Sequence, residues 1–259
     1  MILSAIRAIR SRGTHVPRIA EARPDGLVIA SYNIHKCVGT DGRRDPGRIV
    51  DVIGEIGPDV IALQEVDTRF GERKGLLHLE RLEREHGLVP VPLSKPSTAH
   101  GWHGNIVLYR KGLVSDVHEI RLPGLEPRGA LVTELDFEDD KGVRIIAAHF
   151  GLLRRSREQQ ARAIVDHLGR NKDRPTLVLG DLNEWRVGAK SALNGFSPAF
   201  GPLPPSAPSF PSRLPFLSLD RIISNRPGLI GDVVAHETPL SRVASDHLPV
   251  TTTLLYDAV

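Results

Sequence analysis

Cysteine is almost absent from this chain of 259 residues, which contains only Cys37. A single thiol excludes an internal disulfide framework and a thiolate metal cluster, so a bound metal ion would be held by oxygen and imidazole ligands. The scarcity of cysteine favours a reducing, cytoplasmic location. We interpret Cys37 as a small buried residue and not as a nucleophile, because no other feature of the sequence requires a thiolate.

Long apolar runs are also missing. No stretch approaches the roughly 20 residues that cross a bilayer, and arginines interrupt the N-terminal residues too often for a secretory signal. Residues 1–25 are expected to precede the folded domain. Within them, residues 1–12 have the spacing of a basic amphipathic helix that would lie on an anionic membrane, with a partly disordered tail as the alternative. Peripheral attachment to the membrane is therefore an alternative to a purely cytoplasmic location.

Aromatic residues are few, with two tryptophans and three tyrosines. They form no basic, aromatic-rich stripe of the kind that stacks nucleic-acid bases. The formal net charge of +3 suits an anionic substrate but is too small to indicate one. Glycine fingerprints of dinucleotide sites and P-loops are absent as well. Nothing in the composition indicates an oligomeric state.

Short apolar runs bounded by turn residues make up much of the chain. They predict strands at 27–32, 60–64, 106–109, 130–135, 143–149, 176–179, 219–223 and 249–255. Four helices are predicted at 45–56, 76–86, 156–168 and 184–193.

Strands outnumber helices, and residues 138–142 have the composition of a hairpin turn. This pattern predicts an α/β fold in which two mostly antiparallel β-sheets pack face to face with helices outside. One domain covering 26–259 is expected. The proline-rich residues 196–215 are expected to form a long surface loop of the kind that often borders a site.

Carboxylates stand at several predicted strand ends. Glu65, Asp181 and Asp220 each end an apolar run, and Asp246 precedes the last one. A strand that stops at an acid places that acid at the rim of the sheet, where several such ends can converge on a cation and a phosphate. Each residue alone has an ordinary explanation as a solvated acid, and their joint occurrence carries the argument.

Other polar residues share this placement. Asn33 ends the first predicted strand and, like Glu65, offers a hard oxygen ligand to Mg²⁺ or Mn²⁺. His149 ends another strand just before a basic helix, where a phosphate would be well placed, although most strand-end histidines only pack.

The segment Gly-Asp-Leu-Asn is the sharpest local signal. Asp181 can accept a proton from water, and Asn183 can donate to an oxyanion forming on phosphorus, but the segment can equally be an Asx turn. Asp220 and His247 have the residue types of a histidine with its orienting carboxylate. Asp246 could close a metal site opposite Glu65.

Seven motifs in order resemble the endonuclease/exonuclease/phosphatase superfamily, which has the fold of pancreatic deoxyribonuclease. They are Tyr-Asn-Ile-His, Leu-Gln-Glu-Val-Asp, His-Gly-Asn-Ile-Val-Leu, Ala-His-Phe, Gly-Asp-Leu-Asn, Leu-Asp-Arg and Ser-Asp-His-Leu-Pro-Val, and they span roughly residues 27–255. The resemblance implies a four-layer α/β sandwich. It also implies hydrolysis of a phosphodiester or phosphomonoester with Mg²⁺, or alternatively Mn²⁺, as cofactor.

The same resemblance implies roles for individual residues. Glu65 is similar to the principal metal ligand, with Asn33 and Asp246 as its partners in or near the coordination sphere. Asp181 resembles the residue that positions or deprotonates the attacking water.

The remaining roles concern the phosphate. Asn183 and His149 resemble donors to its oxygens, and Arg128 is an auxiliary contact. His247, paired with Asp220, resembles the group that stabilises the pentacovalent transition state, or alternatively touches a second metal ion.

One departure from the family bears on the substrate. Abasic-site endonucleases of the superfamily carry a lysine two residues after the motif glutamate, whereas this chain has Asp67, which would repel a DNA phosphate. Residues 33–42 look more like small bacterial members, some of which are closer to lipid and small-molecule phosphodiesterases. A role in DNA repair is therefore disfavoured.

The sequence thus predicts a metal-dependent phosphoesterase. A phospholipid or a small phosphodiester is the favoured substrate, and a DNA or RNA nuclease is the alternative. A rival of another class is a protein that binds anionic headgroups without hydrolysis. That rival is disfavoured because no ligand position and no water-activating acid has been lost.

Overall fold

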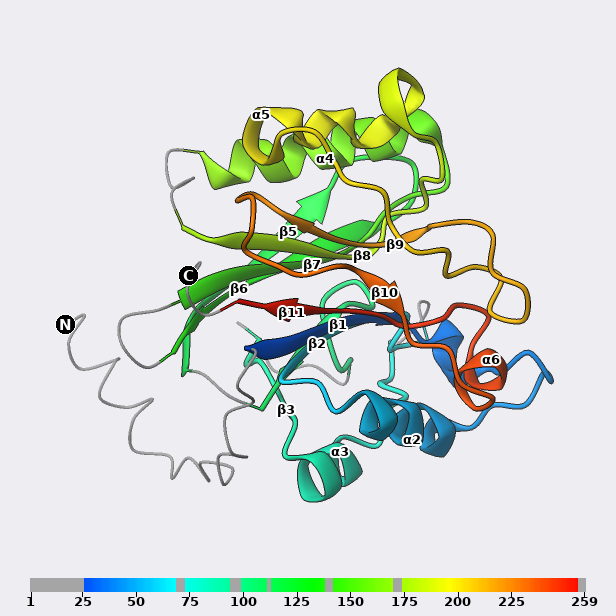
Figure 1. Ribbon diagram of the computed structural model, residues 1–259. Coiled ribbons are helices and arrows are strands. Elements are labelled where there is room, and N and C mark those ends of the chain that lie inside the picture. The colour runs from blue at the N-terminus through cyan, green and yellow to red at the C-terminus, as the bar shows by residue number, and fades with distance from the viewer. Residues whose placement is uncertain are drawn as a thin grey trace.

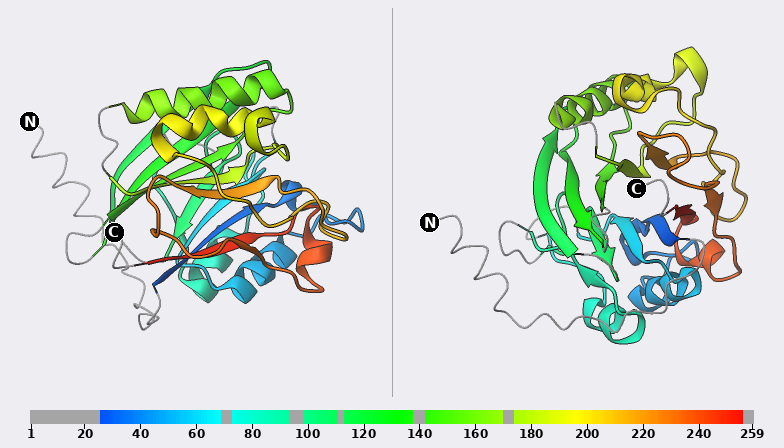
Figure 2. Two further views of the ribbon diagram at one scale, coloured as in Figure 1. Left: turned by 45° about the horizontal axis from the view of Figure 1, so that its top comes forward. Right: turned by 60° about the vertical axis from the view of Figure 1, so that its left-hand side comes forward.

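The computed structural model describes residues 26–68, 73–93, 99–110, 113–137, 142–169 and 174–255. The membrane-associated helix expected within residues 1–12 lies outside them, as does most of the hairpin turn at 138–142. Two β-sheets pack face to face, and helices cover their outer faces (Figures 1 and 2). This arrangement confirms the α/β sandwich predicted from the sequence.

The first sheet has six strands in the order β10-β11-β1-β2-β4-β3. Their bounds are Leu27–Asn33 for β1, Val60–Gln64 for β2, Val89–Pro90 for β3, Ile106–Tyr109 for β4, Val234–Ala235 for β10 and Val250–Leu254 for β11. Helices α2 (Pro46–Ile56) and α3 (Leu79–His86) cover its outer face. Helix α2 begins where the Asp45 carboxylate accepts a hydrogen bond from the Arg48 N–H, and it ends at Gly57, whose φ is 58°.

The second sheet has five strands in the order β5-β6-β7-β8-β9. Their bounds are Leu113–Leu122 for β5, Arg128–Asp136 for β6, Gly142–His149 for β7, Thr176–Asp181 for β8 and Asp220–Ser224 for β9. The outer face is covered by α4 (Arg154–Leu168), the 3₁₀ helix η3 (Ala192–Phe196) and α5 (Ser197–Phe200). Short turns complete the chain at η1 (His35–Cys37), η2 (Gly188–Lys190) and α6 (Ser241–Ala244).

Three apolar clusters hold these layers together. One lies between the sheets and contains Ile29, Leu131 and Leu179. A second joins the first sheet to α2, and a third, which contains Ile146 and Ile164, joins the second sheet to α4. Alternate residues of β7 belong to different clusters, because successive side chains of a strand point to opposite faces.

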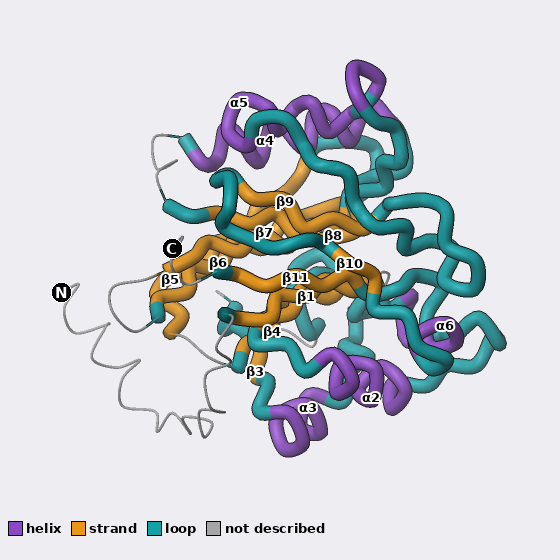
Figure 3. Tube along the Cα trace, viewed as in Figure 1, coloured by secondary structure: helices purple, strands orange, loops and turns teal. Residues whose placement is uncertain are grey.

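Each sheet contains one parallel pairing, β1 with β2 and β7 with β8, and the other pairings between the described strands are antiparallel. Parallel neighbours end at the same edge of a sheet. The two pairs therefore place the ends of β1, β2, β7 and β8 on one side of the molecule, where long loops also lie (Figure 3). These strands end at Asn33, Gln64, His149 and Asp181.

The structure corrects two sequence predictions. Residues 184–193 do not form an α-helix but two 3₁₀ turns, because the carboxylate of Glu184 is buried and accepts hydrogen bonds from the N–H groups of Arg186 and Ala192. The predicted loop at 196–215 begins with helical residues, since η3 and α5 continue through Phe200. In the part of the chain that the structure describes, no helix has the length and apolarity needed to cross a membrane.

Candidate active site

Asp181 lies at the centre of a buried polar cluster that spans both sheets. Its Oδ2 atom accepts a hydrogen bond of 3.0 Å from the Asn33 side-chain amide and lies 3.4 Å from His149 Nε2 and 3.8 Å from His247 Nε2. Strand register produces the cluster: β7 places His149 opposite Asp181, and β9 places Asp220 opposite it. Residues far apart in the sequence therefore meet at one edge of the sheet: His149 and Asp181 end their strands, and Asp220 begins β9, which runs antiparallel to β8.

The environment of Asp181 disfavours its charge. Burial raises the pKa of the Asp181 carboxyl to about 6, and the neighbouring carboxylate of Asp220 adds to the effect, although the charge of His247 opposes it. The other oxygen, Oδ1, accepts a 3.0 Å hydrogen bond from the Asn183 N–H. Asn183 has a φ of 52°, so the segment does form an Asx-type turn while also presenting Asp181 to the cluster.

Asp220 and His247 form a second buried pair beside Asp181. Asp220 Oδ2 lies 2.8 Å from His247 Nδ1 and accepts a 2.5 Å hydrogen bond from the hydroxyl of Ser209. Burial alone would lower the pKa of His247, but the carboxylates of Asp220 and Asp181 raise it to about 10. The ring is therefore cationic near neutral pH, and the sequence prediction that these two residues meet is correct.

Two participants were not recognised in the sequence. Ser209 lies in the proline-rich loop, where nothing distinguishes it from other serines. Lys36 lies in η1, and its Nζ atom is 2.6 Å from Glu65 Oε2. Burial opposes ionisation of Glu65, yet the Lys36 ammonium holds the pKa of that carboxyl below its usual value. The sequence indicates that Lys36 follows the end of a strand. It does not reveal the positive φ angles of His35, Lys36 and Cys37, which form the turn that directs Lys36 towards Glu65.

The remaining predicted residues lie around this cluster with less direct contacts. Asp246 Oδ1 is 3.6 Å from His35 Nδ1, and its neighbour Ser245 donates to the Asn33 carbonyl, which fixes the segment against β1. The Asn183 amide donates to the Phe150 carbonyl at 3.0 Å.

Arg128 is buried beside Glu126, with 2.8 Å between Nη2 and Oε2. Its positive charge also lowers the pKa of Glu65.

The donor atoms suit a hard divalent cation. Asp181, Asp220 and His247 can offer ligand atoms that all lie within 4.8 Å of one another. Glu65 already faces a cation, the Lys36 ammonium, which shows that its position accepts positive charge. Cys37 is buried, and burial raises the pKa of its thiol to about 12, so a thiolate ligand is not available there.

Known proteins share this sequence pattern and fold. The family model described as Endonuclease/Exonuclease/phosphatase family matches residues 30–247. The chain belongs to this family. Members of the endonuclease/exonuclease/phosphatase family are hydrolases that act on phosphate esters, so the resemblance seen in the sequence motifs is confirmed.

Individual relatives are distant. Over 214 residues the chain is 27% identical to the uncharacterized protein YbhP of Escherichia coli, covering 75% of this chain and 83% of that one. An endonuclease/exonuclease/phosphatase structure from Beutenbergia cavernae has a TM-score of 0.63 at 24% identity, over 89% of this chain and 72% of the other. The mannosyl-6-phosphatase Bt3783 of Bacteroides thetaiotaomicron has a TM-score of 0.67 at 16% identity, over 89% and 100%. These structures support the family fold.

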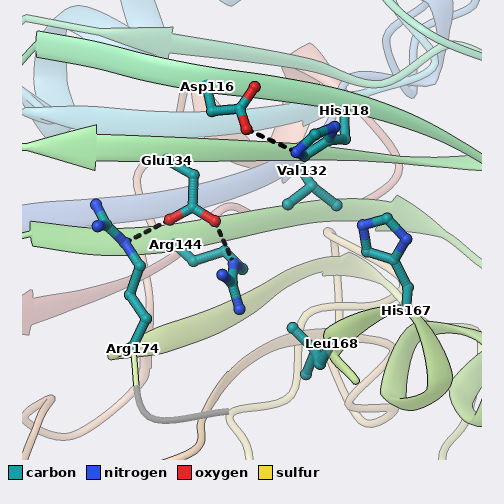
Figure 4. A pocket seen from close by; sticks show the side chains of 8 residues that line it. All are labelled: Asp116, His118, Val132, Glu134, Arg144, His167, Leu168 and Arg174. Carbon is teal, nitrogen blue, oxygen red and sulfur yellow. Dashed lines mark hydrogen bonds and ion pairs between the residues drawn. The ribbon is translucent and has the colours of Figure 1, made fainter. Parts of the chain in front are cut away.

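A separate hollow of about 500 Å³ lies at the other end of the second sheet (Figure 4). Its lining residues are Asp116, His118, Val132, Glu134, Arg144, His167, Leu168 and Arg174. Arg144 and Arg174 both pair with Glu134, and His118 pairs with Asp116 at 2.8 Å. The family motifs end at the opposite side of the same strands, so this hollow is distinct from the Asp181 cluster.

Proposed function

We propose that the chain is a metal-dependent phosphoesterase that hydrolyses a phosphodiester by in-line attack of water. The observation that carries this proposal is the contact of buried Asp181 with Asn33, His149 and His247 across the two sheets. A phospholipid or a small-molecule phosphodiester is the favoured substrate, and Mg²⁺ is the favoured ion, with Mn²⁺ as the alternative.

Asp181 is proposed to position and deprotonate the attacking water. A carboxyl whose pKa lies near 6 is a stronger base than an exposed aspartate and still ionises at neutral pH. The hydrogen bonds from Asn33 and from the Asn183 backbone fix its orientation. This combination of an unusual pKa and a fixed geometry is typical of a catalytic group.

His247 is proposed to hold positive charge against the phosphoryl oxygens. Asp220 fixes one ring nitrogen, and Ser209 in turn fixes the Asp220 carboxylate, so Nε2 is directed towards Asp181 and the space beside it. An orienting carboxylate also keeps the imidazole protonated. His149 and Asn183 are proposed as further donors to the phosphate, and Arg128 as an auxiliary contact.

Glu65, Asn33 and Asp246 are proposed to hold the metal ion. A divalent cation at this position would offset the charge that develops on the phosphoryl oxygens. Because Lys36 pairs with Glu65, the ammonium must move aside when the site is loaded. The group formed by Asp181, Asp220 and His247 is the alternative or second location for an ion.

The case against a DNA substrate rests less on Asp67 than the sequence suggested. The Asp67 carboxylate is buried and lies 3.1 Å from the Arg73 guanidinium, so its charge is largely offset. The shortage of aromatic residues for base stacking still favours a lipid or small diester. A headgroup-binding protein without activity is disfavoured, because the water-activating acid and the histidine pair are assembled.

The proposal is tested by hydrolysis of bis-p-nitrophenyl phosphate, phospholipid vesicles, plasmid DNA and RNA, each with Mg²⁺, with Mn²⁺ and with EDTA. We expect metal-dependent release of p-nitrophenol and of lipid headgroups. Activity that is unchanged by EDTA would refute the metal requirement. Efficient, salt-sensitive cleavage of DNA with no action on lipid would establish the nuclease alternative.

A further inference from the structure

The large apolar side chains that remain exposed are concentrated around the Asp181 cluster. Among the described residues nine such side chains are exposed, and seven of them lie in loops next to strand ends that carry site residues. We call these seven residues, which are between 47% and 85% exposed, the apolar rim: Leu125, Leu152, Leu153, Trp185, Val187, Leu214 and Phe216. Isolated exposed apolar residues are common, but their concentration on one side of a protein indicates a binding surface.

The loops that carry the rim follow directly from the site. Residues 150–153 follow His149, residues 182–187 follow Asp181, residues 123–127 lead into Arg128, and residues 209–219 lead into Asp220. The loops after β8 and before β9 extend from the right-hand side of Figure 1, towards which β1 and β8 point. The rim therefore borders the place where the phosphate is expected.

Hydrogen bonds hold one half of the rim in place. The Leu152 N–H donates to the Glu126 carboxylate at 2.7 Å, which ties the loop after β7 to the loop before β6. The Arg157 guanidinium donates to the Leu152 carbonyl and pairs with buried Glu184 at 3.3 Å. These contacts keep Leu152 at the surface although its burial elsewhere would be favourable.

Trp185 extends the same half. Two guanidinium groups lie over its ring, with Cζ of Arg186 4.5 Å and Cζ of Arg157 5.9 Å from the ring centroid. The ring is thereby oriented but remains 47% exposed, with Val187 next to it in the same loop. Tryptophan is typical of membrane interfaces, where an apolar ring meets polar headgroups.

The other half of the rim is a bent hairpin before β9. Phe210 and Leu217 pair across it. Leu214 and Phe216 lie in the connecting segment and are 74% and 67% exposed. The Arg213 guanidinium donates to the Thr40 carbonyl at 3.1 Å, which fixes the tip against the loop after β1. The hairpin and Trp185 thus flank the cluster from different loops.

The exposed charged side chains next to the rim residues are positive, whereas Glu126, beside Leu125, is partly buried and pairs with Arg128. Arg154 and Arg155 are exposed directly after Leu152 and Leu153, and exposed Arg213 precedes Leu214. Side chains that alternate between aliphatic and basic suit a surface that is apolar within and anionic at its face. Five of the seven rim residues are leucine or valine, which cannot stack nucleic-acid bases, and only Trp185 and Phe216 could do so. The rim therefore favours a lipid surface over a single-stranded nucleic acid.

We propose that the apolar rim docks the catalytic edge on a bilayer that contains anionic phospholipids, and that the scissile phosphate belongs to a lipid in that bilayer. The docking itself does not depend on the proposed phosphoesterase function. Only the statement that the scissile phosphate belongs to a membrane lipid rests on that function. Docking places a headgroup phosphate beside Asp181 and His247 without removing the lipid fully from its membrane. The rim consists of described residues alone and does not include residues 1–12.

The test uses the full chain and a triple variant, Leu152→Ser/Val187→Ser/Phe216→Ser. Sedimentation with vesicles of phosphatidylglycerol and phosphatidylcholine is measured in EDTA, and hydrolysis of bis-p-nitrophenyl phosphate is measured with Mg²⁺. Leu255→Ser is the matched control, because Leu255 is exposed at the opposite end of the first sheet, next to Leu254, which pairs with Leu27 at the start of β1. We expect the triple variant to bind vesicles roughly tenfold or more weakly, with unchanged turnover of the soluble diester, and the control to bind normally.

Equal vesicle binding by the wild type and the triple variant would overturn the inference, as would binding of duplex DNA and not of vesicles. If the wild type docks through the rim but hydrolyses neither the soluble diester nor lipid, docking stands and the proposed activity fails. If the triple variant is misfolded, quenching of Trp185 by brominated lipid in a Trp102→Phe background replaces it. Absence of quenching there would contradict docking.

Discussion

The two ends of strands β7 and β8 carry polar clusters of opposite character. At one end, Arg144 and Arg174 bracket Glu134, so each buried charge has a partner of opposite sign. At the other end, the carboxylates of Asp181 and Asp220 both lie against the cationic ring of His247. The first arrangement satisfies its own charges, and the second has an excess of negative charge that a cation and a protonated ring must offset.

This difference supports our proposal that the Asp181 cluster is the functional one. A group held in a costly ionisation state must be maintained by the rest of the fold, and such groups gather where chemistry occurs. Asp220 Oδ1 and Glu134 Oε2 are both buried without a hydrogen-bond partner among the described residues, but the Glu134 oxygen lies in an ion pair with Arg174. The hollow beside Glu134 has a volume of about 500 Å³, but its charges are paired. The balance of charges is therefore a better guide to the functional site in this protein than the volume of a hollow.

Among the changes that test this comparison, we expect the largest effect from a substitution of Asp181. We expect Asp181→Asn to lower kcat by roughly 10²–10⁴, because the variant loses a positioned base. Burial raises the pKa of Asp181, so the folded state loses stability through this group as pH rises from about 4 through about 6. The neutral amide removes that cost, and the Tm of the metal-free variant at pH 8 should not fall.

Steady-state kinetics measure the loss of kcat in Asp181→Asn, and thermal melts measure its Tm. Isothermal titration calorimetry with Mn²⁺ measures the metal affinity. Asp181→Asn should retain most of its metal affinity, whereas Glu65→Gln should lose both affinity and turnover. Near-normal turnover of Asp181→Asn would contradict the assignment of the base.

The next change removes the charge that supports His247. In Asp220→Asn the pKa of His247 should fall from about 10 towards its ordinary value near 6.5. A raised histidine pKa adds stability that is complete below pH 6.5 and is lost as pH rises through 10, so the variant should show a smaller loss of stability over that range. Imidazole NMR shifts of the metal-free protein measure the pKa directly, and an unchanged titration would show that Asp220 does not act on the ring.

Lys36 offers a smaller effect at the same end. Because its ammonium pairs with Glu65, it competes with a metal ion for that carboxylate. We expect Lys36→Met to bind Mn²⁺ on the order of 2–5-fold more tightly, as for a partly exposed ion pair. Calorimetry measures the affinity, and Lys190→Met, at an exposed lysine in η2, controls for the loss of one positive charge. Weaker binding by Lys36→Met would show that the lysine supports the site instead.

Much of this site could be predicted from the sequence because its residues end strands. Asn33, His149 and Asp181 follow recognisable apolar runs, and strand pairing then brings them together. Lys36 and Ser209 reach the site through loop conformations that no periodicity records. The false helix at 184–193 had suitable residues, but buried Glu184 pairs with Arg157 on another element, and such tertiary contacts override local preference.

At the end of the sheet that carries Glu134, a substitution should lower stability and leave kcat unchanged, the opposite of what we expect at Asp181. Glu134→Gln removes the carboxylate that pairs with the buried guanidinium of Arg144 and with Arg174, which should lower the free energy of unfolding by about 1–3 kcal/mol. The kcat of the folded enzyme should be unchanged, since the site lies at the other end of the strands. Urea denaturation and steady-state kinetics test this prediction, and a large loss of kcat in fully folded protein would contradict it.

The smallest effect is expected at the exposed lip of the same hollow. His118 and Asp116 form an ion pair of 2.8 Å, but their side chains are 49% and 56% exposed, so water screens the interaction. The His167 ring lies edge-on to His118, with 5.8 Å between the centroids, and burial lowers the pKa of His167. Asp116→Asn should therefore change the free energy of unfolding by less than about 0.5 kcal/mol and leave kcat/KM unaltered. A tenfold fall in kcat/KM, measured on folded protein, would show instead that this hollow is coupled to the Asp181 cluster through β7 and β8, and the two ends of the sheet could no longer be treated as separate.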